Sequence, residues 1–299
     1  MTSPFDLSAY LKERITRVDE YLTGIIDSVD DTSGALGRAM RYSIFAGGKR
    51  LRPMFAIAAS EAVGGSLEQV LPAACALELI HTYSLIHDDL PAMDDDDYCR
   101  GVLTNHKVFG EATAILAGDA LLTKAFEVLA DITRFAAAPI ALLRISSEVA
   151  RAAGDAGMVG GQMIDMESEN RDIDLDMLTA LHRKKTGALI TVSVRTGAIL
   201  GGADDEQVKA LSEYGECVGL AFQISDDILD VVGDQEKLGK RTGMDEARGK
   251  KTFTTLLGLE ESRKRSKDLI DRAVGALSSF DTRAEALRAI GRYVIERQA

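Results

Sequence analysis

The sequence predicts an all-α protein, and three features of the chain support this. Apolar residues recur at intervals of three and four through most of the 299 residues, beginning with Leu7 and Leu11, which is the helical period. Alternation of apolar and polar residues, the pattern of a strand, is scarce. The chain has only five prolines, and Pro53, Pro72 and Pro139 lie near expected helix starts, where proline is tolerated.

We expect helices at about 5–28, 34–46, 52–64, 68–90, 107–131, 138–170, 174–201, 204–232, 253–276 and 282–297. Glycines predict breaks near residues 154–157 and near Gly187. No repeat of fixed period and no linker rich in Pro, Gly and Ser interrupts the chain, so we expect one domain over residues 1–299. Residues 233–251 hold four glycines and six basic residues, which predicts a mobile, locally cationic loop.

Composition limits the possible functions. Apolar residues make up 46% of the chain and Trp is absent, as in a soluble protein with an aliphatic core. The net charge of −12 argues against nucleic acid as the main partner, because a phosphate backbone requires a basic surface. Cys75, Cys99 and Cys217 form neither a disulfide framework nor a zinc motif. The chain shows no secretion signal and no run of eighteen apolar residues, so we expect a cytoplasmic protein without stable membrane insertion.

Residues 88–97 read DDLPAMDDDD and follow an apolar helical run. Acidic groups at a helix C-terminus oppose the macrodipole, by ~0.3 to 1 kcal/mol each. Pro91 ends the helix and allows the chain to turn, so that Asp94 folds back toward Asp88. A compensating cation is therefore expected, whereas Asp95, Asp96 and Asp97 fit a solvated acidic loop.

A second acidic cluster, DDILD, occupies residues 226–230 at the end of another apolar run. Asp226 and Asp230 lie about one helical turn apart on the same face, where two like charges destabilise a helix. Oxygen donors without His or Cys favour Mg²⁺ or Mn²⁺ over zinc. The two clusters together therefore predict a metal site.

Cationic segments accompany both clusters. Residues 47–53, GGKRLRP, place Lys49, Arg50 and Arg52 behind two glycines at a helix start, a suitable anion site, although a basic surface patch fits equally well. Further basic residues lie in HRKKTG and in the glycine-rich loop, namely Lys184, Lys185, Lys240, Lys250 and Lys251.

His81 precedes Asp88 by two helical turns on the same face, so it either reaches the same cavity or packs in the core. No serine or cysteine nucleophile is recognisable beside a base. Carboxylates that bind metal, together with cations that bind phosphate, indicate a leaving group activated by metal.

The chain resembles the trans-isoprenyl diphosphate synthases, in particular bacterial farnesyl diphosphate synthases. The resemblance rests on GGKRLRP at 47–53, LIHTYSLIHDDLPAMDDDD at 79–97, GQMIDMESE at 161–169, KTGAL at 185–189 and FQISDDILD at 222–230. It implies an all-α isoprenoid synthase fold of about ten or more helices around a deep cavity, usually in a homodimer. It also implies that an allylic diphosphate held by three Mg²⁺ ionises and that C4 of isopentenyl diphosphate attacks the resulting cation.

The resemblance also assigns roles to individual residues. Asp88 and Asp94 would bind two of the metals and Asp226 the third, with Asp89 and Asp230 in support. The residues expected to hold isopentenyl diphosphate are Lys49, Arg52, His81 and Arg100. Those expected to face the allylic substrate are Lys185, Thr186, Gln223, Lys240 and Lys250, with the Thr186 and Gln223 oxygens toward the developing cation.

Product length is expected to depend on Tyr83. At ~1.5 Å of rise per residue, Tyr83 lies ~7.5 Å below Asp88, toward the apolar end where the growing tail extends. In the family, an aromatic residue at this position, with Pro91 and Ala92 in the acidic segment, is typical of enzymes that stop at fifteen carbons. The simpler interpretation of Tyr83 is an ordinary core aromatic residue.

Two positions depart from the family pattern. Cys99 stands where the family has the first of two arginines, and a thiol cannot replace the charged fork that grips a diphosphate. Lys107 or Lys251 could supply the missing charge. The segment KKTFTTLLG at 250–258 lacks the usual Tyr-Pro pair, which we expect to affect loop rigidity more than chemistry.

Three alternatives remain at this point. A geranylgeranyl diphosphate synthase would share every catalytic feature and differ mainly in cavity depth. A non-catalytic regulatory subunit of a prenyl synthase would be compatible with Cys99, although such subunits commonly lose one acidic cluster, and both are present here. A terpene cyclase needs no isopentenyl diphosphate site, so GGKRLRP argues against it.

Overall fold

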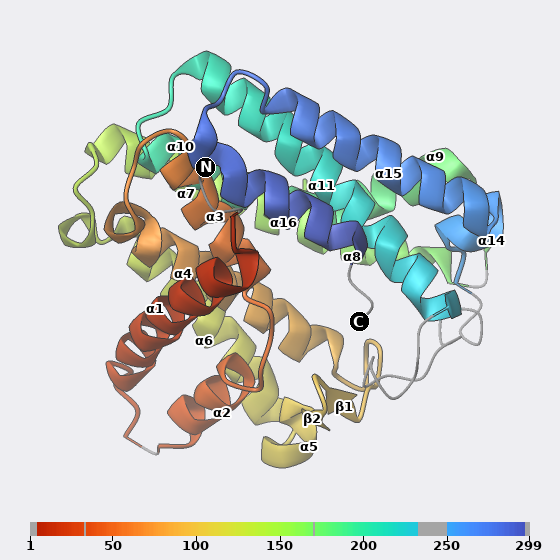
Figure 1. Cartoon of the computed structure of the whole chain (residues 1–299). Helices are drawn as coiled ribbons and strands as arrows, with labels where there is room; N and C mark the ends of the chain where they lie inside the picture. The colour runs from red at the N-terminus through yellow and green to blue at the C-terminus, as the bar shows by residue number, and fades with distance from the viewer. Residues whose placement is uncertain (1–4, 33, 170, 233–249, 297–299) are drawn as a thin grey trace.

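The computed structural model describes residues 5–32, 34–169, 171–232 and 250–296, which form a bundle of helices (Figure 1). The helices are α1 (Leu7–Asp27), α2 (Ala35–Ile44), α3 (Leu51–Ala62), α4 (Leu67–Asp88), α5 (Asn105–Phe109), α6 (Glu111–Ala130), α7 (Pro139–Ala153), α8 (Met158–Ser168), α9 (Leu175–His182), α10 (Ala188–Leu200), α11 (Asp205–Val232), α14 (Phe253–Leu257), α15 (Leu259–Ala276) and α16 (Glu285–Glu296). Short 3-10 turns cover Ile132–Arg134 and Thr282–Ala284. The all-α prediction is confirmed.

The expected helix breaks are present, and two breaks were not expected. The expected helix at 107–131 is divided at Gly110 into α5 and α6. α7 ends at Ala153 and α8 begins at Met158, as the glycines at 154–157 predict. The break near Gly187 is a π-helical turn, Arg183–Gly187, between α9 and α10. The expected helix at 253–276 is divided into α14 and α15 at Gly258.

A two-stranded antiparallel hairpin, β1 (Tyr98–Cys99) and β2 (Val102–Leu103), was not predicted from the sequence. Strands of two residues are too short to show alternation. Arg100 and Gly101 form the turn and both have positive φ, 52° and 82°, as a tight hairpin turn requires.

The core joins helices from both ends of the chain. The main cluster of buried apolar residues extends from Tyr10 in α1 to Val294 in α16. α11 and α15 lie side by side in opposite directions (Figure 1). A second, smaller cluster of Leu178, Leu220 and Phe253 packs α9 against α11 and α14.

By length and composition α4 could cross a membrane. It is the one helix of this kind in the described part of the chain. Its most apolar window is 78% buried inside the protein. α4 is therefore a core helix that packs against α3, α6 and α10.

Candidate active site

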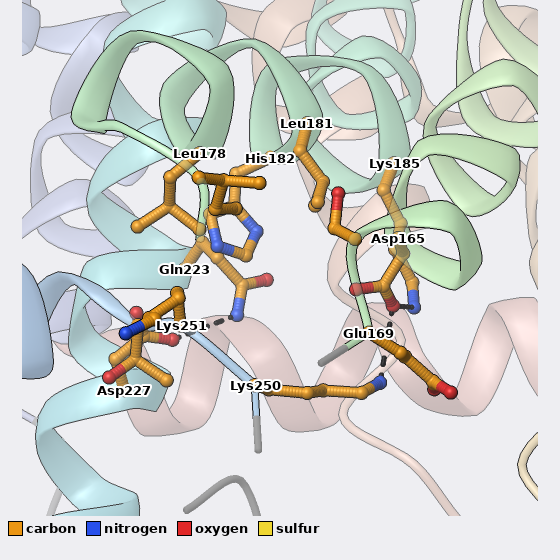
Figure 2. Close-up of a pocket in the computed structure, with 13 residues that line it drawn as sticks. Asp165, Glu169, Leu178, Leu181, His182, Lys185, Gln223, Asp227, Lys250 and Lys251 are labelled. Atoms are coloured by element: carbon orange, nitrogen blue, oxygen red, sulfur yellow. Dashed lines mark hydrogen bonds and ion pairs between the residues drawn. The ribbon is translucent and has the colours of Figure 1, made fainter. Parts of the chain in front are cut away.

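A pocket of about 160 Å³ lies between α8, α9, the π-helical turn, α11 and residues 250–252. Its walls carry acidic and basic side chains from distant parts of the sequence, including Asp165, Lys185, Gln223, Asp227 and Lys250 (Figure 2). Three of these, Lys185, Gln223 and Lys250, were expected to face the allylic substrate. The fold therefore brings them together.

Asp165 on α8 binds two of the expected phosphate-binding lysines. Its Oδ2 accepts hydrogen bonds from Lys185 Nζ at 2.6 Å and from Lys250 Nζ at 3.3 Å (Figure 2). Burial opposes ionisation, but the two ammonium groups keep the pKa of Asp165 below its usual value. The sequence did not predict a role for Asp165, although an acidic residue in the apolar run MVGGQMIDM is a signal for one.

The first acidic cluster folds back on itself as expected. Asp94 N–H donates to the carbonyl oxygen of Asp88 at 2.9 Å, which closes the turn that follows α4. Lys250 Nζ lies 3.9 Å from Asp94 Oδ1. Lys250 therefore connects the first acidic cluster to Asp165 in the pocket.

Asp88 occupies an environment that is short of positive charge. Burial raises the pKa of its carboxyl to about 6, with Asp94 and Asp165 adding to the effect and Lys185 opposing it. A carboxylate in such a place favours a cation beside it.

The second acidic cluster lies in the last two turns of α11. Asp226 and Asp230 are half-buried, whereas Asp227 is only 2% exposed. Within the described residues, no three Asp, Glu, His or Cys side chains converge closely enough to hold a metal by themselves. The residues present nevertheless fit Mg²⁺, because the donors are carboxylate oxygens only and Asp88 is short of positive charge.

A cationic site, separate from the pocket described above, forms where the β1–β2 turn meets α3 and α4. Arg100 donates from Nη1 to the carbonyl oxygen of Gly47 at 2.5 Å and from Nη2 to His81 Nε2 at 3.2 Å. A Cβ on Gly48 would lie 2.8 Å from the Arg100 guanidinium carbon, and the positive φ of Gly48, 132°, also favours glycine here.

Arg52 and His81 show that this site is enriched in positive charge. Burial lowers the pKa of His81 well below its usual value, and Arg52 and Arg100 lower it further. Burial and Arg100 also lower the pKa of Arg52 to about 10, against the attraction of Glu78. Because His81 Nε2 accepts from Arg100, the ring proton lies on Nδ1. Three of the residues expected to hold isopentenyl diphosphate therefore lie together.

The other cations of GGKRLRP are placed differently. Lys49 is exposed, with its Nζ 6.0 Å from the centre of the Tyr293 ring. Arg50, which the sequence grouped with the anion site, is buried instead and pairs with Asp19 at 2.9 Å and Glu78 at 3.0 Å. It ties α1 to α4, so it has a structural role.

Tyr83 lies in α4, buried to 7% exposure, and its ring packs edge-on against His87 at 5.8 Å. Burial and the Asp88 charge raise its pKa to about 12, so the phenol stays neutral. Asp89 is half-buried beside Cys99 in the lining of a small cavity.

The π-helical turn brings Thr186 to Gln223. Thr186 Oγ1 donates to Gln223 Oε1 at 3.2 Å, and Gln223 Nε2 donates to Asp227 Oδ1 at 3.2 Å. Single π-helical turns are common at functional sites because they re-aim side chains within a helix. Lys240 and the rest of residues 233–249 lie outside the described residues.

Comparisons with known proteins identify the family of the chain. The family model described as polyprenyl synthetase matches residues 34–290. A farnesyl diphosphate synthase from Geobacillus stearothermophilus is 45% identical over 96% of this chain and 97% of its own length. A geranylgeranyl diphosphate synthase from Cyanophora paradoxa is 44% identical over 98% of this chain and 97% of its own.

Among solved structures, an FPP/GFPP synthase from Zymomonas mobilis matches with a TM-score of 0.86 and 38% identity, over 97% of this chain and 98% of that one. The match of the family model, the near-complete coverage and the clustered acidic and basic residues lead to one assignment. The chain belongs to the polyprenyl synthetase family, whose prenyltransferases elongate isoprenoid diphosphates.

Proposed function

We propose that this protein is a farnesyl diphosphate synthase. It would condense isopentenyl diphosphate head-to-tail with dimethylallyl and then geranyl diphosphate, releasing pyrophosphate in each step. The observation that carries the proposal is the chain of contacts from Asp94 through Lys250 and Asp165 to Lys185. These contacts connect the first acidic cluster to the pocket beside α11, the helix that carries the second.

Asp88, Asp94 and Asp226 are the proposed principal Mg²⁺ ligands, with Asp89 and Asp230 in support. The fold family implies three Mg²⁺, which would neutralise the departing pyrophosphate. Lys185, Lys240 and Lys250 would contact the same diphosphate. Asp165 accepts hydrogen bonds from two of these lysines, Lys185 and Lys250.

The cationic site of Arg52, His81 and Arg100, with Lys49 at its rim, is proposed to bind isopentenyl diphosphate. When the allylic carbon–oxygen bond breaks, the Thr186 and Gln223 oxygens would face the cation that forms. The C4 alkene carbon of isopentenyl diphosphate would attack C1 of the allylic cation. A proton would then leave C2 of the isopentenyl unit for an oxygen of the released pyrophosphate. No strong acid is needed, because fixed cations stabilise the leaving group.

A geranylgeranyl diphosphate synthase is the second candidate, because a synthase with that name is 44% identical to this chain. The two candidates differ in product length alone. We favour the C15 product because the bulky, buried Tyr83 lies one and a half turns below Asp88. A non-catalytic subunit is less favoured, since both acidic clusters are present.

We also propose a homodimer and a cytoplasmic location. Exposed apolar side chains on α5 and α6, Val108, Ile115 and Leu116, are consistent with a covered surface in a dimer. Light scattering on the purified protein should give about twice the chain mass of 32.2 kDa.

An assay of the purified protein tests the proposal. Protein, Mg²⁺ and isopentenyl diphosphate are incubated with dimethylallyl or geranyl diphosphate, and the dephosphorylated products are separated by chromatography. We expect farnesol as the main product and no product when the metal is chelated. A main product of twenty carbons would favour the second candidate, and no condensation with either allylic substrate would refute both.

A further inference from the structure

Asp227 is the second of the three aspartates in the second acidic cluster, and its side chain lies in a different environment from those of Asp226 and Asp230. It is 2% exposed, whereas both neighbours in the cluster are half-buried. Each of its carboxylate oxygens accepts a hydrogen bond from the protein. Oδ1 accepts from Gln223 Nε2 at 3.2 Å, and Oδ2 accepts from the backbone N–H of Phe253 at 2.7 Å.

The contact with Gln223 determines which way the Gln223 amide points. A carboxylate only accepts hydrogen bonds, so the amide must present its NH₂ group to Asp227. The amide oxygen then points away, where it accepts the hydroxyl proton of Thr186 at 3.2 Å. Figure 2 shows the Gln223 nitrogen turned toward Asp227 and its oxygen toward the side of the pocket where Lys185 and Asp165 lie.

The contact with Phe253 holds the carboxylate itself in place. Phe253 is fully buried between α9 and α11, where its ring stacks on His182 at 5.6 Å. Its backbone N–H is the first of α14, a position without an intrahelical acceptor. Asp227 therefore satisfies this buried donor and cannot turn freely toward the solvent.

We propose that Asp227 is a positioning residue that orients the Gln223 oxygen into the active-site pocket. This rests on the proposed function, in which that oxygen faces the allylic cation. If the amide turned over, it would present a partly positive NH₂ group to Thr186 and to the pocket instead. The acidic cluster thus divides its work between metal binding at Asp226 and amide orientation at Asp227.

The substitution Asp227→Asn separates orientation from packing. In this variant the backbone N–H of Phe253 still donates, so the oxygen of the new amide must face Phe253. The NH₂ group of that amide then points at Gln223. Gln223 then turns over to accept this new donor, so the hydrogen bonds to Phe253 N–H and between the two side chains are kept. We expect kcat to fall ~10- to 100-fold, because a misdirected dipole no longer favours the developing charge. The KM for isopentenyl diphosphate should change less than about threefold, since Arg52, His81 and Arg100 are untouched.

A complementary exchange provides the rescue. In the double variant Asp227→Asn with Gln223→Glu, the Glu carboxylate accepts from the Asn NH₂ on one side and presents an oxygen to Thr186 on the other. We expect at least about tenfold recovery of kcat over Asp227→Asn alone. Gln223→Glu alone brings two carboxylates within hydrogen-bonding distance and should be impaired.

Asp226→Asn is the matched control one position earlier on α11. It should raise the Mg²⁺ concentration at half-maximal rate, whereas Asp227→Asn should leave that concentration within about twofold of the wild-type value. If Asp227→Asn instead behaves like Asp226→Asn, and saturating Mg²⁺ restores its kcat, Asp227 is a metal ligand and the proposal is overturned.

Thermal unfolding without metal or substrate tests the same coupling independently of the reaction. Gln223→Glu should lower Tm by roughly 2–4 °C, while Asp227→Asn and the double variant should stay within about 1 °C of the wild type. A double variant as unstable as Gln223→Glu would contradict the proposal. The wild type could show no condensation while the Tm values of the single and double variants follow this pattern. In that case the proposed function fails, but the proposal that Asp227 orients the Gln223 amide stands.

Discussion

Cys99 is the residue at which the chain departs most from the prenyl synthase pattern. It lies half-buried on β1 and lines a small cavity with Asp89 and Thr82. Of the cations considered as replacements, Lys107 is paired with Asp97 at 2.6 Å and Lys251 with Asp172 at 2.9 Å. Both pairs involve exposed side chains and are weak, so neither prevents these lysines from turning toward a diphosphate.

Cys99→Arg should strengthen binding of the allylic diphosphate. A charge-assisted hydrogen bond contributes about 1.5–3 kcal/mol, so the KM for geranyl diphosphate should fall roughly ten- to 100-fold. Steady-state kinetics measures this, with Cys99→Ser as the neutral control. An unchanged KM in the Arg variant would mean that another cation already occupies this role.

Tyr83→Ala should lengthen the product, because removing the ring opens space along α4 below Asp88. The expected result is C20 product in place of C15, with a loss of stability of about 3–5 kcal/mol typical of a deleted buried aromatic ring. Product chromatography checks the length. Tyr83→Phe keeps the ring and should keep the C15 product, and unchanged C15 in the Ala variant would remove this role from Tyr83.

At the scale of elements, α8 and the π-helical turn lie in close contact. A Cβ on Gly161 would collide with the backbone of Lys185, so the α8 glycine allows the turn to bring Lys185 to Asp165. The turn also presents Thr186 to Gln223. Two short elements thus position Asp165 and Lys185 in the pocket and Thr186 against Gln223.

Gly161→Ala should push the π-helical turn away from α8. We expect a loss of about 1–3 kcal/mol in stability, the usual cost of overpacking, and a higher KM for the allylic substrate. Denaturant unfolding and kinetics measure the two effects. Gly24→Ala is the control, because its Cβ meets nothing within 4 Å inside helix α1, and it should be neutral or slightly stabilising.

Helix boundaries were predictable where glycines and prolines mark them, and the hairpin was not. The break before Met158 follows from local glycines. The β1–β2 hairpin contains too few residues for a pattern, and its turn, Arg100-Gly101, is not one of the pairs that mark hairpins in sequences. This matters for the site, since the hairpin turn is what carries Arg100 to His81.

At the scale of the whole molecule, the buried Asp88 should make stability depend on pH. Its folded pKa of about 6 lies above the ordinary value of 3.8, so it contributes stability that is fully present below pH ~4 and is lost as pH rises through about 6. The pKa difference corresponds to up to ~3 kcal/mol.

Comparison of Asp88→Asn with the wild type isolates this contribution. Without metal, the variant should be the more stable protein at pH 8, and its advantage should shrink as the pH falls from 6 to 4. Denaturant titrations across this range measure the difference in the free energy of unfolding between the two proteins. A difference that does not change with pH would contradict the raised pKa of Asp88. Added Mg²⁺ with pyrophosphate should stabilise the wild type more than the variant.

The sequence by itself determined the all-α fold, most helix boundaries and the two acidic clusters, because apolar periodicity and like charges on one helix are local properties of the chain. Only the tertiary structure decided which side chains meet. Asp165 binds two lysines, Arg50 pairs with the buried Glu78 instead of joining the anion site, and Asp227 accepts the backbone N–H of Phe253. Each of these contacts joins residues far apart in the sequence, so it depends on tertiary packing that no local pattern encodes.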